Sequence, residues 1–205
     1  QLSCWRQHRN VTLGRRVRLV PRRRNRRPTA FRATMDHVEF LTRATIWITI
    51  VAYTVGSVLF ARSQGRMRWD AAVRVAWTIG VVALITHFVC ADQFFHHWSQ
   101  DSALRDTARQ TKEVVGLNWS GGLYINYALL IVWIADVAWW WIAGLTSYRA
   151  RPWLVIAAWH GFIIFILFNA TIVFKDGTVR WVGLVVCSVL LLAWAQIARQ
   201  GLSPL

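Results

Sequence analysis

The sequence predicts an all-α polytopic membrane protein, a bundle of about five transmembrane helices with one short amphipathic surface helix. Charged residues make up only 16% of the chain, whereas soluble domains carry about 25%. Hydrophobic residues make up 56%, and they gather in runs close to the ~20 residues that a helix needs to cross a bilayer. Many of the 14 Trp residues fall near the ends of these runs, where their rings favour the membrane–water interface.

The first two spans are predicted at about residues 44–61 and 73–91. No charged residue interrupts the first span. Its Thr and Ser hydroxyls can bond to backbone carbonyls of the same helix, so they cost little in lipid. The basic segment 62–72 connects the two spans, with Gly65 as its turn. This pattern predicts a short basic loop between the two spans.

The long connection over residues 92–122 is expected to contain the surface helix. Asp101 is placed to cap the start of this helix, and Gly116 suits its end. Opposite charges four residues apart stabilise exposed helices. Two such pairs are expected here, Asp101 with Arg105 and Arg109 with Glu113.

The last three spans are predicted at about residues 123–143, 153–174 and 178–198. Pro152 suits the first turn of the fourth span because its missing N–H is not needed there. Residues 175–177 are too few for anything but a hairpin, so the fourth and fifth spans should be antiparallel neighbours. The run Trp139–Trp141 is interpreted as an interfacial anchor, as are Trp77 and Trp194.

An arginine-rich tail precedes the spans. Residues 1–34 carry 11 of the net 15 positive charges and no acidic residue. This composition predicts a disordered, solvated arm, with residues 35–205 forming the transmembrane domain. Anionic lipid is favoured over nucleic acid as a partner for such an arm.

The charge distribution predicts a multi-pass protein of the cell membrane, but it leaves the orientation open. Met35 is a candidate start of the natural protein. With that start, the basic loop 62–72 faces the cytoplasm and the N-terminus lies outside. Counting the arginine-rich tail as part of the protein reverses this orientation.

Asp136 and His160 are ionisable residues inside predicted spans, where such residues are costly and so suggest function. Each lies seven residues inside its span, on the side facing the turn that joins the third and fourth spans. At a rise of ~1.5 Å per residue, both side chains sit roughly 10 Å deep. We therefore expect an intramembrane polar pair, hydrogen-bonded directly. Its role is either to hold two helices in register or to carry protons or a solute.

A second polar group lies at the opposite end of the bundle, formed by His87, Asp92, His96 and His97. Imidazole and carboxylate are ligands that Zn, Cu and Fe accept, so these four residues are candidate metal ligands. The simpler interpretation is a set of polar helix-end groups. A haem held by His87 and His160 is disfavoured because their depths differ by ~10 Å, while a haem with one axial histidine stays open.

Three functions remain from the sequence. The first is a non-catalytic subunit or scaffold that works with other membrane subunits. The second is a redox protein that uses a transition metal or haem at the His87/Asp92/His96/His97 end. The third is a small transporter or proton relay through Asp136 and His160. The sequence shows no nucleophile elbow, phosphate loop or H-E-x-x-H motif. Whether the chain is an enzyme stays open.

Overall fold

The computed structural model describes residues 29–63 and 67–201, and within these ranges the chain is helical without strands. Five of its helices are long and apolar enough to cross a membrane. The predicted all-α polytopic bundle is therefore confirmed. The candidate spans are listed in chain order: His37–Ser63, Trp69–His96, Gly122–Gly144, Trp153–Val173 and Thr178–Arg199.

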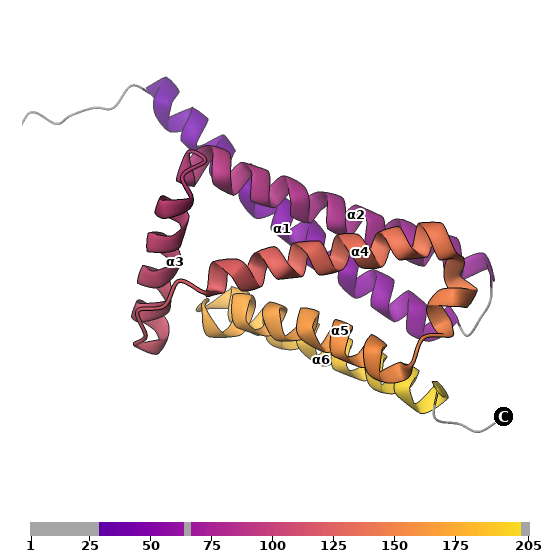
Figure 1. Ribbon diagram of the computed structural model, residues 1–205. Helices are drawn as coiled ribbons and strands as arrows, with labels where there is room; N and C mark the ends of the chain where they lie inside the picture. Colours follow the sequence, from indigo (N-terminus) through magenta and orange to yellow (C-terminus); the bar gives the residue numbers. More distant parts are fainter. Residues whose placement is uncertain (1–28, 64–66, 202–205) are drawn as a thin grey trace, which may run out of the picture.

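The helices α1, α2, α4, α5 and α6 run along the bundle, and α3 lies across one of its ends (Figure 1). Turns of π-helix, η1 and η2, continue α2 and α5 at that same end. The bounds of the elements are α1 Thr29–Ser63, α2 Met67–Ala91, η1 Asp92–His96, α3 Gln100–Val115, α4 Gly122–Arg149, α5 Trp153–Phe168, η2 Asn169–Val173 and α6 Thr178–Gly201.

Helix α1 begins inside the segment predicted as the tail. Residues 1–28 lie outside the described residues. The last part of the tail, residues 29–34, is described and belongs to α1. Helix α1 thus begins six residues inside the segment that composition assigned to the arm.

Small residues allow α1 and α2 to pack closely. A Cβ atom added to Gly56 on α1 would lie 2.7 Å from Cδ1 of Trp77 on α2. A Cβ added to Gly80 on α2 would lie 2.7 Å from the Trp133 ring of α4. Close approach through small residues is the usual basis of helix association in membranes. The bundle is therefore assembled around large aromatic side chains that fill the spaces left by glycine.

Replacing Gly56 by alanine is expected to destabilise the bundle by about 1–3 kcal/mol, because Trp77 would have to move within a packed core. Trp77 is 1% exposed, and the centroid of its ring lies 4.4 Å from the centroid of the Trp140 ring, so the Trp77 ring has no free space to enter. Gly161→Ala is the matched control, because a Cβ there meets nothing within 4 Å. Thermal unfolding in detergent, followed by tryptophan fluorescence, should show a loss for Gly56→Ala alone. Equal melting temperatures for the two variants would contradict the close packing.

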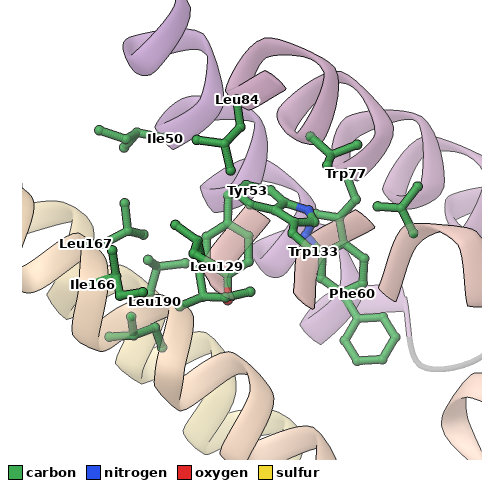
Figure 2. Packing of buried hydrophobic residues seen from close by; sticks show 14 of the residues in the cluster. Ile50, Tyr53, Phe60, Trp77, Leu84, Leu129, Trp133, Ile166, Leu167 and Leu190 are labelled. Carbon is green, nitrogen blue, oxygen red and sulfur yellow. The ribbon is translucent and has the colours of Figure 1, made fainter. Parts of the chain in front are cut away.

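The core lies between α1, α2 and α4 on one side and α5 and α6 on the other. Figure 2 shows Tyr53, Phe60, Trp77 and Trp133 packed together, with Leu190 of α6 close by. Trp77 and Trp140 are 1% and 2% exposed, so the prediction that they anchor the protein at the interface is wrong. Each projects from the inward face of its helix. Trp139 and Trp141, the neighbours of Trp140, are exposed as an interfacial anchor requires.

The predicted surface helix is α3, and its start and ion pairs differ partly from expectation. Ser99 caps the helix, its Oγ accepting a hydrogen bond from the backbone N–H of Ser102. Arg105 pairs with Asp101 as predicted, at 2.6 Å. Arg109 pairs with Asp106, three residues earlier, at 2.9 Å. Gly116 ends the helix in the left-handed conformation, with φ 78°.

A kink at Gly144 redirects the end of α4. Its φ of 74° and ψ of 170° interrupt the helical backbone, and this conformation is essentially restricted to glycine. Beyond the kink, α4 continues to Arg149 and turns away from the line of the span (Figure 1). The chain therefore returns toward the bundle before α5 begins, which places residues 148–151 near the buried polar groups.

Candidate functional site

Asp136 of α4 and His160 of α5 are both buried, at 2% and 1% exposed. The structure brings both of them into contact with a third residue, Tyr148. The Tyr148 hydroxyl lies 3.4 Å from Oδ2 of Asp136 and 2.8 Å from Nε2 of His160. The expected direct hydrogen bond is thus replaced by a tyrosine bridge, because the kink at Gly144 folds Tyr148 between the two side chains.

The other nitrogen of His160 is also engaged. Nδ1 lies 2.9 Å from the hydroxyl of Tyr53, which comes from α1. Three spans therefore meet at one imidazole ring: α1 through Tyr53, α4 through Tyr148 beyond its kink, and α5 through His160 itself.

The hydrogen bonds of this group can all run in one direction. Tyr148 donates to Asp136, so its oxygen is free to accept from Nε2–H of His160. Nδ1 then accepts from the Tyr53 hydroxyl. This assigns the Nε2–H tautomer to His160, an assignment made from the hydrogen-bond pattern. We call Asp136, Tyr148, His160 and Tyr53 the buried polar chain.

Arg151, from the turn between α4 and α5, lies at one end of the buried polar chain. Its Nη1 lies 3.4 Å from Oδ1 of Asp136, and its side chain is 16% exposed. The guanidinium also lies over the rings of Tyr148 and Trp139, at 4.7 and 4.5 Å from their centroids. Cation–π contacts of this kind strengthen when they are shielded from water. Arg151 thus neutralises the buried carboxylate and covers it.

Burial raises the pKa of the Tyr148 hydroxyl well above its ordinary value, and the nearby Asp136 carboxylate raises it further. Ionising Tyr148 would place a second negative charge beside Asp136 in a medium of low dielectric constant. The hydroxyl therefore keeps its proton at physiological pH. It can donate to Asp136 while it accepts from His160.

Aromatic rings enclose His160 on two faces. Trp194 of α6 stacks on the imidazole with centroids 3.6 Å apart and an interplanar angle of 20°. Trp77 lies 5.3 Å away, at 22°. The indole N–H groups of Trp77 and Trp194 have no hydrogen-bond partner among the described residues. These two rings therefore hold the imidazole by packing rather than by hydrogen bonding.

The four candidate metal ligands at the other end of the bundle contact different partners. Nδ1 of His87 lies 3.0 Å from the carbonyl oxygen of Thr42 on α1. Nδ1 of His96 lies 3.7 Å from Oδ2 of Asp106 on α3. His97 is exposed in a left-handed turn, with φ 51°, and Asp92 is half-buried at the start of η1.

These positions do not form a metal centre. Within residues 29–63 and 67–201, no group of three or more His, Cys, Asp or Glu side chains is arranged to hold a metal ion. The π-helical turn η1 explains part of the difference, because its i→i+5 bonding shifts the register that would align Asp92 with His96 on an α-helix. A haem ligated by His160 also fits poorly, because both nitrogens of this ring bond to tyrosine hydroxyls.

Three members of the site were not predicted from the sequence: Tyr53, Tyr148 and Arg151. Tyr53 interrupts an apolar run in the first span, and a hydroxyl in that setting needs a partner. That signal indicates a buried contact but not which residue makes it. Tyr148 and Arg151 lie in what resembles an ordinary basic turn.

Comparison with known proteins finds no matching family model, no similar curated protein and no similar solved structure.

Proposed function

We propose that the chain is a non-catalytic membrane protein, a structural subunit or scaffold within a larger membrane complex. The observation that carries this proposal is the closure of the buried polar chain. Asp136, Tyr148, His160 and Tyr53 are each at most 2% exposed, and each bonds to another residue of the same protein. A substrate would have no access to these groups.

The cavities at the surface lie elsewhere. One, of about 410 Å³, lies between α3 and the loop that follows it. Another, of about 470 Å³, is lined by apolar residues of α4 and α5. Neither is lined by a member of the buried polar chain. The role of the buried polar chain in this proposal is structural: it fixes α1, α4 and α5 relative to one another.

The outer surface of the α4/α5 pair supports the subunit part of the proposal. The apolar cavity there is lined by Ala158 together with larger side chains such as Trp159 and Phe162. Gly161 leaves further room on α5, since a Cβ there meets nothing within 4 Å. Membrane helices associate by van der Waals packing where small residues let them approach. Such a surface suits a transmembrane helix of another subunit.

A proton relay is the second candidate, favoured by the single direction of the hydrogen bonds in the buried polar chain. Beyond Tyr53, hydroxyls continue along the buried face of α1 at Thr45, Thr49 and Ser57. Thr49 bonds to the carbonyls of Thr45 and Gly80. A proton can move along bonded hydroxyls and imidazole. Against this candidate, the hydroxyl of Thr49 bonds to backbone carbonyls and not to Tyr53.

One preparation tests both candidates. The full chain, solubilised from its own membrane in mild detergent, is expected to carry other membrane subunits in fixed stoichiometry. Reconstituted into liposomes with an internal pH dye, it should conduct no more protons than empty liposomes. A monomer with a stoichiometric metal or a haem absorption band would contradict the proposal.

Tyr53→Phe separates the two candidates, because it removes one hydroxyl and keeps the ring. If wild-type protein conducts protons and this variant does not, at an unchanged melting temperature, the relay is correct and the structural role is not. Val55→Ala on α1 is the control, since that side chain is exposed to lipid and lies outside the buried polar chain.

A further inference from the structure

A row of cations lies on the surface helix α3, away from the buried polar chain. Arg105, Arg109 and Lys112 follow one another at spacings of four and three residues, which places them on one face of the helix. All three line the cavity of about 410 Å³. The opposite face of α3 packs on the bundle, with Ala103 and Thr111 buried. The cations therefore point away from the protein core.

The carboxylates nearby neutralise only part of this charge. Arg105 pairs with Asp101 and Arg109 with Asp106. Lys112 has no carboxylate partner among the described residues. Asp101 is the acidic residue that lines the cavity, so its lining carries three positive charges and one negative charge. The cavity is thus suited to an anion.

Neutral hydrogen-bonding groups complete the lining. Asn118 and Ser120, from the loop between α3 and α4, line the same cavity as the cations. An amide and a hydroxyl can both donate to anionic oxygens. Cations on one wall and neutral donors on another are the groups that bind phosphate, with arginine particularly suited to its oxygens.

The position of α3 places this cavity at the level of lipid headgroups. The helix follows the span ending at His96 and precedes the span beginning at Gly122, and it lies across the end of the bundle (Figure 1). Trp98 and Trp119 flank it in sequence and are 63% and 51% exposed. Exposed tryptophans at span ends mark the membrane interface.

We propose that the cavity formed by Arg105, Arg109, Lys112, Asn118 and Ser120 binds the phosphate of an anionic phospholipid. The net positive lining distinguishes this class from zwitterionic lipids, whose headgroup carries a cation beside the phosphate. Each basic residue near a membrane surface adds roughly a fivefold gain in binding to anionic lipid, so the net two positive charges of the lining contribute a gain on the order of 25-fold.

Native mass spectrometry of the full-length protein in detergent tests the proposal, with phosphatidylglycerol, phosphatidylcholine and inorganic phosphate as the probes. Wild-type protein is expected to bind phosphatidylglycerol in preference to phosphatidylcholine. The triple variant Arg105→Gln/Arg109→Gln/Lys112→Gln should lose that preference. Lys112→Gln alone should weaken it about fivefold, and Lys112→Arg should keep it.

Arg43→Gln is the matched control. Arg43 is an exposed arginine that pairs with an acid four residues earlier, Glu39, as Arg105 does with Asp101. It does not line the cavity, so its loss should leave the lipid preference unchanged. Equal binding of the two lipids by wild-type protein would overturn the proposal, as would a triple variant that keeps the preference. Binding of inorganic phosphate without phosphatidylglycerol would overturn the lipid assignment and indicate a soluble anion.

Discussion

Replacing Arg151 by glutamine is expected to lower the free energy of unfolding by about 3 kcal/mol, because it leaves a buried carboxylate without its cation. Asp136 is 2% exposed, and its Oδ1 lies 3.4 Å from the guanidinium of Arg151. Glutamine also cannot lie over the Tyr148 ring as a cation. The loss should appear as a lower denaturant midpoint in detergent, followed by tryptophan fluorescence.

The double variant Asp136→Asn/Arg151→Gln identifies the cause of this loss. Asparagine carries no charge, so removing the cation should then cost much less than it does beside aspartate. The double variant is expected to be more stable than Arg151→Gln alone. If the loss of stability in the double variant equals the sum of the losses in the two single variants, Arg151 stabilises by packing and not by charge.

Arg105→Gln provides a comparison at the surface. Arg105 and Asp101 are only 2.6 Å apart, closer than Arg151 and Asp136, but their side chains are 71% and 78% exposed. Water screens such a pair, so its loss should cost less than about 1 kcal/mol. A larger effect for Arg105 than for Arg151 would contradict the importance of burial.

The spans were predictable because lipid imposes a strong requirement on composition. A helix that crosses hydrocarbon must be apolar over about 20 residues, and that pattern is local in the sequence. The level at which Asp136 and His160 meet followed from the rise per residue alone. Both predictions depend on the rise of a regular α-helix, which the chain keeps from Gly122 to Ala143 and from Trp153 to Phe168.

The bridge between these two residues was not predictable, because it depends on a break in that regularity. Gly144 adopts a conformation that other residues avoid, and the sequence around it is still apolar and helix-like. The sequence pattern therefore predicts a loop at Tyr148. The structure folds it inward, where it is 1% exposed.

The proposed metal ligands illustrate the same limit at the other end of the bundle. Asp92 and His96 share a face only if the α-helix continues through them. The π-helical turn η1 changes that spacing. His96 instead lies near Asp106 of α3, a contact between segments that no local pattern indicates. Clusters of ionisable residues in sequence thus predict a polar region more reliably than a coordination geometry.

Replacing His160 by alanine is expected to have the largest effect, a loss of about 4 kcal/mol, because it combines a cavity with unpaired buried polar groups. The hydroxyls of Tyr53 and Tyr148, both 1% exposed, would lose their shared partner. The ring of Trp194 would lose the imidazole that stacks on it at 3.6 Å. Denaturant unfolding in detergent gives the measurement.

His160→Gln keeps the prediction testable if the alanine variant does not fold. A glutamine amide supplies a carbonyl acceptor and two N–H donors, so it can accept from Tyr53 and donate to Tyr148 as the imidazole does. It should recover part of the stability but not the stacking on Trp194. His97→Asn is the control: His97 is exposed in a left-handed turn, a conformation that asparagine tolerates, and its replacement should leave the unfolding midpoint unchanged. An alanine variant at position 160 as stable as this control would show that the buried polar chain does not hold α1, α4 and α5 together.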